Sequence, residues 1–264
     1  EILQSADDTY LLEQYSISYA GSCRLFLEQN KEFFEFKAPE YWAGFSPYYL
    51  DDRKLSAATD EVEALSKMTG GQKFVGPDCT KENFLNNNQN YSVLHLAMHA
   101  EINQSNPSYN KLLFADGELN ASEIYFSQSK ANLAILSACN TGFGKLEKGE
   151  GVMSMARAFH FSGIPSVVMS LWKVPDRETK IIMLSFYEYL KKGKSKSEAL
   201  RLAKLDYLKN TTDKELLHPY FWSGFVVNGN TEPIDFGGDV NYLFWAGMLV
   251  IFLLLGGYVF NRVR

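Results

Sequence analysis

The sequence predicts an α/β fold with a mostly parallel sheet flanked by helices, followed by a C-terminal transmembrane helix. Three observations predict it: short apolar runs bounded by polar turns, helical patterns that alternate with those runs, and an uncharged apolar stretch near the C-terminus. Alternation of strands and helices is typical of parallel sheets that helices cover on both faces. We therefore expect one globular domain over residues 1–229, a linker over 230–241, a transmembrane helix over 242–260 and a short basic tail over 261–264.

The predicted strands are short and apolar. Tyr91–Met98, Ala131–Ala138 and Ser166–Trp172 have the length and composition of buried parallel strands. Tyr15–Ala20 alternates between apolar and polar residues and also predicts a strand, whereas Phe33–Leu50 is rich in aromatic residues without a clean period and is expected to be a loop.

The predicted helices show apolar residues at helical spacing. Ser195 precedes the last of them and Glu198 follows three residues later, which indicates a capping box. The expected helices cover Glu61–Met68, Val152–Phe161, Glu178–Leu190 and Ser197–Leu208.

The C-terminal stretch Tyr242–Phe260 carries no charge and would span about 28 Å as a helix, close to the hydrocarbon thickness of a bilayer of about 30 Å. Arg262 and Arg264 follow it, and the positive-inside rule then places the C-terminus in the cytoplasm. We expect a single-pass membrane protein whose globular domain is periplasmic or extracellular. A tail-anchored protein with its domain in the cytoplasm is the alternative.

Composition excludes several classes. A formal net charge of −5 without a dense basic run excludes nucleic acid as a direct partner. The three cysteines Cys23, Cys79 and Cys139 are widely spaced, so they predict neither a zinc ribbon nor a disulfide framework, although Cys23 and Cys79 could pair outside the cytoplasm. The first residue is Glu and no signal peptide precedes it, so we expect a piece of a longer protein.

A metal site is not expected. His95 and His99 are four residues apart, which suits zinc only on a helix, and position 96 is Leu where a metalloprotease needs Glu. On a strand the two side chains would be about 13 Å apart, too far to share one ion.

His99 and Cys139 remain as candidates for catalysis. Each stands just after a predicted strand, and the carboxyl ends of parallel strands are where such sheets place their chemistry. A thiol becomes a good nucleophile at neutral pH when a base lies beside it. The alternatives are a buried structural cysteine with a hydrogen-bonded core histidine, and another thiol enzyme, such as an acyltransferase, that uses the same pair.

Five motifs in order closely resemble the CHAT domain family, caspase-like cysteine peptidase domains that are often found C-terminal to tetratricopeptide repeats. The similarity covers about residues 11–229 and implies a caspase-haemoglobinase-like α/β fold. The motifs are His95–Ala100 (HLAMHA), Leu136–Gly144 (LSACNTGFG), Gly149–Ala158 (GEGVMSMARA), Ser170–Asp176 (SLWKVPD) and His218–Gly229 (HPYFWSGFVVNG).

The resemblance implies a cysteine endopeptidase that cleaves a protein or peptide substrate without a cofactor. Cys139 matches the family nucleophile and His99 its acid and base, and the backbone N–H groups of Cys139 and Ala100 would form the oxyanion hole. Glu150 and Asp176 lie in matching loops and could form a specificity pocket for a basic side chain. A tetratricopeptide-repeat region would precede this chain.

One residue departs from the family pattern. A Gly commonly follows the histidine, and Ala100 stands there; if that position needs a positive φ, the alanine would be strained and the oxyanion donor displaced. The second hypothesis is therefore an inactive CHAT domain that acts as a membrane-tethered interaction scaffold. His95 and His218 are expected to be structural, and His160 has no predicted partner.

Overall fold

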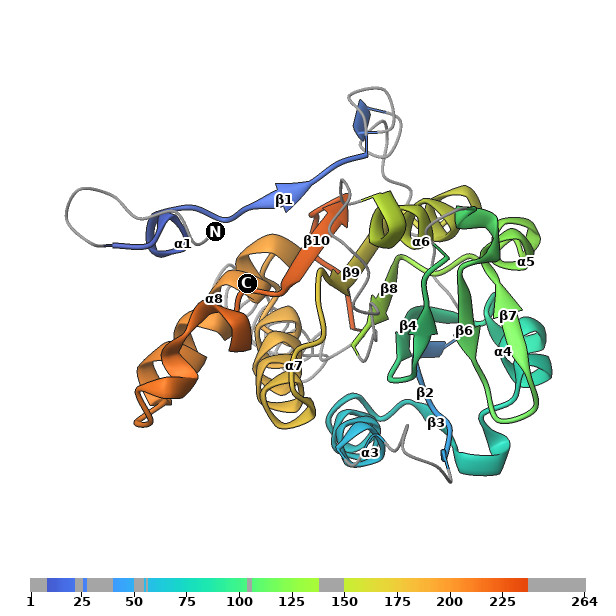
Figure 1. Cartoon of the computed structure of the whole chain (residues 1–264), viewed down its shortest axis with the longest axis horizontal. Helices are drawn as coiled ribbons and strands as arrows, with labels where there is room; N and C mark the ends of the chain where they lie inside the picture. Colours follow the sequence, from blue (N-terminus) through green and yellow to red (C-terminus); the bar gives the residue numbers. More distant parts are fainter. Residues whose placement is uncertain are drawn as a thin grey trace, which may run out of the picture. The chain divides into compact units, whose positions relative to one another are not determined.

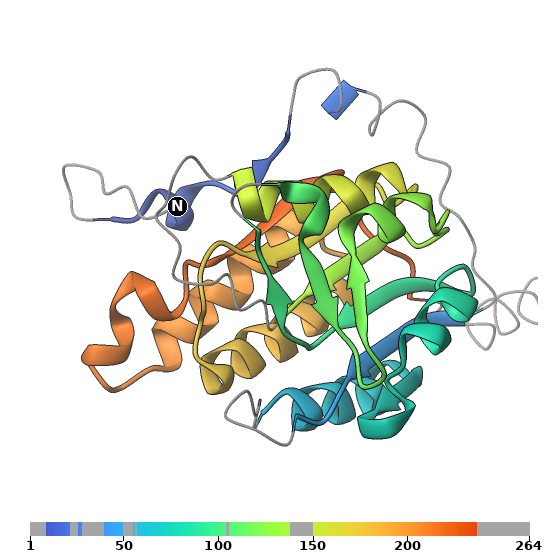
Figure 2. The same ribbon diagram turned by 45° about the vertical axis from the view of Figure 1, so that its right-hand side comes forward.

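The computed structural model describes residues 9–21, 26–27, 40–49, 55, 57–103, 106–137 and 150–236. The chain forms two compact units, residues 1–234 and 235–264, and every helix and strand named below belongs to the first. In the described part of that unit, a seven-stranded sheet lies between two layers of helices (Figures 1 and 2).

The main sheet has the strand order β1-β10-β9-β8-β4-β2-β3. Every neighbouring pair is parallel except β9 and β10, which are antiparallel, so the prediction of a mostly parallel sheet is confirmed. The strands are β1 (Ser18–Tyr19), β2 (Glu40–Ser46), β3 (Gln72–Val75), β4 (Tyr91–Leu96), β8 (Leu133–Leu136), β9 (Ser166–Ser170) and β10 (Phe225–Gly229).

The three predicted apolar strands correspond to β4, β8 and β9 at the centre of the sheet. The expectation of a loop over Phe33–Leu50 is wrong for Glu40–Ser46, because these residues form β2, which pairs with both β3 and β4. Trp42 and Phe45 are both fully buried, one on each face of β2, and a strand buried on two faces shows no alternation of polar and apolar residues. The aromatic residues of β2 therefore show no period of two from which a strand could be predicted.

The helices confirm the four predicted helical segments, which lie within α3, α6, α7 and α8. The Ser195 side chain accepts a hydrogen bond from the Glu198 N–H at the start of α8, as expected for a cap. The described helices are α1 (Leu11–Gln14), α3 (Ala58–Thr69), α4 (Lys81–Asn87), α5 (Ala121–Phe126), α6 (Glu150–Phe161), α7 (Asp176–Lys191) and α8 (Lys196–Asn210), with short 3-10 turns η1 (Gly76–Asp78), η2 (Pro107–Tyr109), η3 (Glu215–Leu217) and η4 (Pro219–Phe221).

The two faces of the sheet are covered by different helices. Leu94 and Leu96 of β4 pack into a core with Ile124 of α5 and Phe159 of α6. His95, on the other face of the same strand, contacts residues of α3 and α7. Alternation along β4 thus divides its side chains between two separate packing environments.

A three-stranded antiparallel sheet follows directly from β4. It consists of β5 (Ala100–Glu101), β6 (Lys111–Leu113) and β7 (Glu118–Asn120), in that order. Since β5 begins one residue after His99, this small sheet fixes the direction in which the chain leaves the main sheet at that point.

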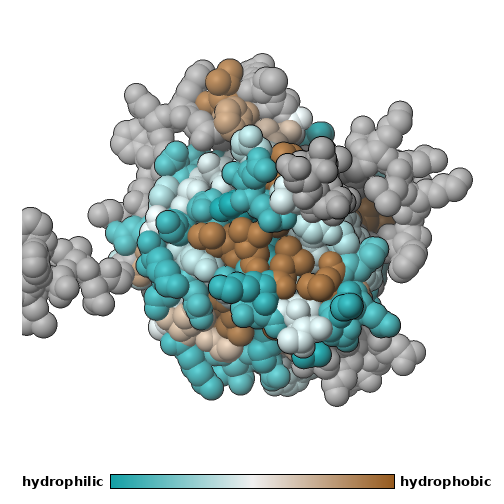
Figure 3. All heavy atoms as spheres, turned by 90° about the vertical axis from the view of Figure 1, so that its left-hand side faces the viewer, coloured by the Kyte–Doolittle hydropathy of each residue, from teal (hydrophilic) through white to brown (hydrophobic). Residues whose placement is uncertain are grey.

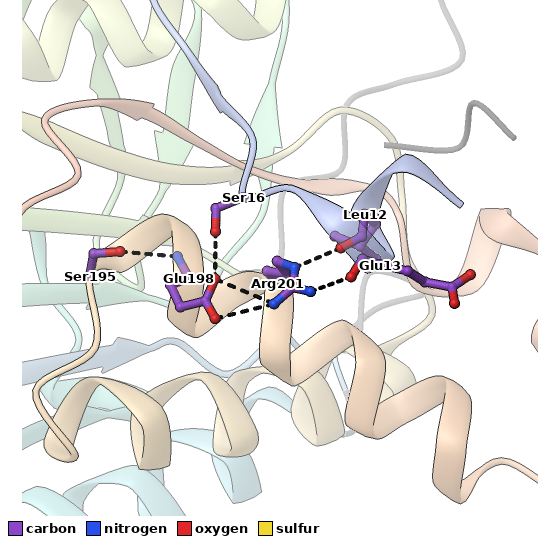
Figure 4. Close-up of polar contacts among 6 residues, drawn as sticks. All are labelled: Leu12, Glu13, Ser16, Ser195, Glu198 and Arg201. Carbon is purple, nitrogen blue, oxygen red and sulfur yellow. Dashed lines mark hydrogen bonds and ion pairs between the residues drawn. The ribbon is translucent and has the colours of Figure 1, made fainter. Parts of the chain in front are cut away.

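The N-terminal segment packs against α8 and the β10 edge. Arg201 of α8 donates hydrogen bonds to the carbonyl oxygens of Leu12 and Glu13, and Ser16 donates to Glu198 (Figure 4). Leu12 is fully buried. The face that lies on the left in Figure 1 is mostly hydrophilic, with apolar side chains gathered near its middle (Figure 3).

The structure corrects the expected membrane anchor. None of the described helices is long and apolar enough to cross a membrane. The longest of them, α7 and α8, have 16 and 15 residues and carry several charges, whereas a span needs about 20 mostly apolar residues. The predicted helix over 242–260 lies outside the described residues. For the described residues the fold class is therefore corrected to an α/β fold in which no helix could cross a membrane, and this finding contradicts the prediction of a single-pass membrane protein.

Candidate active site

The candidate site lies beyond the ends of two adjacent parallel strands. In the register of β4 and β8, Leu96 is the partner of Leu136, and the Ser137 N–H donates to the Leu96 carbonyl at 3.1 Å. His99 is three residues beyond Leu96 in the sequence, and Cys139 is three residues beyond Leu136. The two candidates therefore stand at equivalent sequence positions after neighbouring strands. Cys139 itself lies outside the described residues.

His99 is buried, with 4% of its surface exposed, and its backbone is held on both sides. Its N–H donates to the Tyr49 hydroxyl at 3.1 Å, and its carbonyl accepts from the Leu113 N–H at 3.0 Å. The Tyr49 hydroxyl donates in turn to the Leu113 carbonyl at 2.7 Å. The centroids of the phenol and imidazole rings are 4.7 Å apart. Tyr49 was missed from the sequence because it follows the strand taken for a loop.

Ala100 shows no sign of the predicted strain. It lies in β5, and among the described non-glycine residues only Gln128 has a positive φ. Ala100 is paired with Leu112, and the bond from the Leu113 N–H to the His99 carbonyl makes this a non-hydrogen-bonded pair. The Ala100 N–H therefore points away from β6. The main reason for the hypothesis of an inactive scaffold is removed.

The two acidic residues predicted for a specificity pocket begin helices. Glu150 is the first residue of α6 and Asp176 the first of α7. Because β9 runs parallel to β8, the chain leaving β9 toward Asp176 starts from the same sheet end as the chain leaving β8 toward Cys139. Asp176 is half-buried. The pocket stays a prediction.

His95 takes part in a buried polar chain that the sequence did not reveal. The Trp42 indole N–H donates to the Tyr187 hydroxyl at 2.8 Å, His95 Nδ1 lies 3.1 Å from that hydroxyl, and His95 Nε2 lies 2.7 Å from Glu61 Oε1. The indole N–H of Trp42 donates to the Tyr187 hydroxyl, and a carboxylate only accepts hydrogen bonds, so the Nε2–H of His95 donates to the Glu61 carboxylate. Burial raises the pKa of Tyr187 well above its usual value; the Trp42 hydrogen bond opposes the rise and the Glu61 charge adds to it.

The other histidines have structural contacts. His218 Nδ1 accepts from the Tyr220 N–H at the start of η4, in line with the expected structural role. His160 Nδ1 lies 2.8 Å from the Ile164 carbonyl oxygen and Nε2 lies 2.7 Å from Asn228 Oδ1.

Cys79 is a free, fully buried thiol. Burial, and to a lesser extent the charge of Asp116, raises its pKa far above that of an ordinary cysteine, so it is unreactive at neutral pH. Cys23 lies outside the described residues.

Three comparisons place this chain among known proteins. The sequence model of the family described as CHAT domain matches residues 1–230. Tetratricopeptide repeat protein 28 is 25% identical in Homo sapiens and 23% identical in Mus musculus, in each case over 88% of this chain and 11% of the relative. This chain thus spans about a tenth of the length of these relatives.

The fold is shared with solved structures. Two crystal structures of the Saccharomyces cerevisiae separase–securin complex contain a chain that superposes with TM-scores of 0.57 and 0.52, at 16% and 15% identity, over 84% of this chain and 14% of that chain. At this identity the similarity concerns the fold, which is the caspase-like α/β fold that the motifs implied.

Proposed function

The chain belongs to the CHAT domain family, and from this premise we propose that it is a cysteine endopeptidase in which Cys139 is the nucleophile and His99 the acid and base. The single observation that supports the proposal is the register of β4 and β8, in which Leu96 is paired with Leu136 and each of these residues comes three positions before a candidate in the sequence. Residues that follow neighbouring parallel strands at the same end of a sheet are where α/β folds commonly place their chemistry.

The proposed reaction has two stages. The Cys139 thiolate attacks the peptide carbonyl carbon and forms a C–S bond, while the carbonyl electrons move to the oxygen. The C–N bond then breaks, and the His99 imidazolium gives its proton to the leaving amine. In the second stage water attacks the thioester, His99 takes a proton from that water, and the Cys139 thiolate leaves.

The oxyanion of each stage needs donors that are already in place. We assign this role to the backbone N–H groups of Cys139 and Ala100. The extended backbone at Ala100 and the direction of its N–H, away from β6, support the assignment. Loss of one such donor typically costs about 100- to 1,000-fold in rate, so the direction of the Ala100 N–H bears directly on activity.

Glu150 and Asp176 would bind a basic side chain next to the cleaved bond. Asp176 is half-buried, and a half-buried carboxylate attracts a cation more strongly than one in bulk water, because the surrounding protein lowers the effective dielectric constant. The relatives are named for tetratricopeptide repeats, and this chain spans 11% of their length, which supports a role as the effector part of a longer, repeat-containing protein.

The test is the pH dependence of alkylation of Cys139 by iodoacetamide in the 264-residue chain, compared with His99→Ala, with peptide mass spectrometry to assign the site. We expect an apparent thiol pKa well below the free value of about 8.5 in the unmodified chain and a return toward that value in the variant. Cys79, buried with a raised pKa, is an internal control that should stay unlabelled. Identical pH profiles in the two proteins would refute the dyad.

Cleavage of a peptide library provides the second arm. Cys139→Ala should abolish cleavage without changing the urea unfolding midpoint. Cleavage that persists in this variant would show that another group performs the reaction.

A further inference from the structure

Three parallel neighbours end at the same edge of the sheet, and each is followed by a residue of interest. β2 pairs with β4 with Phe45 opposite Leu96, and the Ala97 N–H continues the pairing to the Phe45 carbonyl at 2.9 Å. Tyr49 therefore follows β2, the neighbour of β4 on one side, and β8, the strand that precedes Cys139 in the sequence, is the neighbour of β4 on the other side. This places a phenol next to the proposed acid and base.

The Tyr49 hydroxyl closes a ring of hydrogen bonds around the His99 backbone. It accepts from the His99 N–H and donates to the Leu113 carbonyl, while the Leu113 N–H donates to the His99 carbonyl. The main chain at His99 has left β4 and not yet entered β5, so the sheet ladder does not fix its N–H. A side chain has to satisfy this buried donor, and Tyr49 does so.

The Tyr49 ring restricts the imidazole as well. The two ring centroids are 4.7 Å apart with an interplanar angle of 47°, within the range of favourable aromatic contacts. The phenol thereby occupies volume into which the imidazole would otherwise rotate. The backbone hydrogen bond and the ring contact come from one residue, so Tyr49 bears on both the position and the orientation of His99.

We propose that Tyr49 is the positioning residue that holds His99 in place to activate Cys139. The inference rests on the proposed function, because it assigns Tyr49 to the activation of that thiol. Tyr49 touches no reacting atom in this account and acts only through the imidazole. A thiolate is stabilised by a nearby imidazolium, and the stabilisation weakens as the distance between them grows. Loss of the anchor therefore raises the pKa of the Cys139 thiol.

The experiment compares Tyr49→Phe with Tyr48→Phe in the full 264-residue chain. Tyr49→Phe keeps the aromatic ring and removes both hydrogen bonds of the hydroxyl. Tyr48→Phe is the matched control, because Tyr48 is the neighbouring tyrosine and 57% of its surface is exposed. The measurement is the pH profile of Cys139 alkylation, beside the urea unfolding midpoint. We expect Tyr49→Phe to raise the apparent thiol pKa by about one unit, which lowers the rate about tenfold at pH values below it. Tyr48→Phe should leave the profile unchanged.

The outcomes separate the two proposals. If the unmodified chain and His99→Ala have the same profile, the proposed function fails and the role of Tyr49 fails with it. If His99→Ala changes the profile and Tyr49→Phe does not, the dyad stands and the positioning role is overturned. A purely structural role for Tyr49 would change the unfolding midpoint and leave the profile as it is, which also overturns the inference.

Hydrogen exchange gives a readout that needs no variant. The His99 amide should exchange slowly in the unmodified chain, because its N–H is bonded to the Tyr49 hydroxyl. If Tyr49→Phe fails to fold, this measurement decides the matter: a rapidly exchanging His99 amide in the folded chain would overturn the proposal.

Discussion

The pair of Glu61 and His95 gives the sharpest test of the fold, because it can be compared with an exposed pair on the same helix. Glu61 of α3 is 2% exposed and the His95 side chain is fully buried. Glu63, two residues on, forms an ion pair with Lys73 in which the two side chains are 43% and 44% exposed. Replacing Glu61 or Glu63 by Ala therefore removes the same chemical group from two different environments.

The expected magnitudes follow from burial. Glu61→Ala leaves the His95 Nε2–H buried without its acceptor, which costs about 1–3 kcal/mol for a neutral donor and about 3–5 kcal/mol where a buried charge loses its partner. We expect a loss of about 3 kcal/mol, where these two ranges meet. Glu63→Ala should cost under about 1 kcal/mol, because solvent screens the exposed pair. Glu61→Gln keeps an oxygen that can accept from His95, so its cost should lie between the two.

Urea unfolding at neutral pH, followed by far-UV circular dichroism, measures these differences. With slopes of about 1–3 kcal/mol per M urea, the midpoint of Glu61→Ala should fall by about 1 M or more, and that of Glu63→Ala by a few tenths. A Glu61→Ala midpoint no lower than that of Glu63→Ala would refute the reasoning, since the buried chain of donors and acceptors would then contribute nothing to the stability.

Three further predictions concern pH and the N-terminal segment. The pKa of Tyr187 is raised in the folded chain, so above pH 10 the unfolded chain loses a proton that the folded chain keeps. The free energy of unfolding should therefore fall as the pH rises above 10. Tyr187→Phe should remove this part of the fall, measured by urea unfolding at a series of pH values. Burial lowers the pKa of His160, and the hydrogen bonds to Asn228 and Ile164 oppose this shift. Stability that is present above pH 6.5 should therefore be lost as the pH falls below that value. His160→Gln should reduce the dependence of the unfolding free energy on pH in this range, and an unchanged dependence would contradict the lowered pKa. Arg201→Ala removes the hydrogen-bond donors to the carbonyls of Leu12 and Glu13 in the N-terminal segment. In amide hydrogen exchange, residues 9–21 should then exchange faster, while β4 and β8 stay protected. Equal exchange rates in the two proteins would show that the segment does not depend on Arg201.

Local patterns in the sequence determined the central architecture. β4, β8 and β9 are short, continuous apolar runs, and α3, α6, α7 and α8 carry apolar residues at helical spacing, so each could be predicted from its own residues. The positions of His99 and Cys139 after two predicted strands made them candidates, and the family motifs then implied the caspase-like fold and the role of each residue. The pairing of these two residues stays a prediction, because Cys139 lies outside the described residues.

Only the tertiary structure decided the features that depend on contacts between distant segments. Tyr49 reaches Leu113 across 64 positions of sequence, His95 reaches Tyr187 across 92, and Trp42 reaches Tyr187 across 145. Composition also predicted a transmembrane helix, whereas no helix among the described residues could cross a membrane. Periodicity reports which side of a segment is apolar, whereas the partner of a buried polar group is set by how strands and helices pack. The sequence therefore determined the central strands and helices and the candidate catalytic residues. The tertiary packing decided which side chains contact the candidate residue His99 and the buried histidine His95.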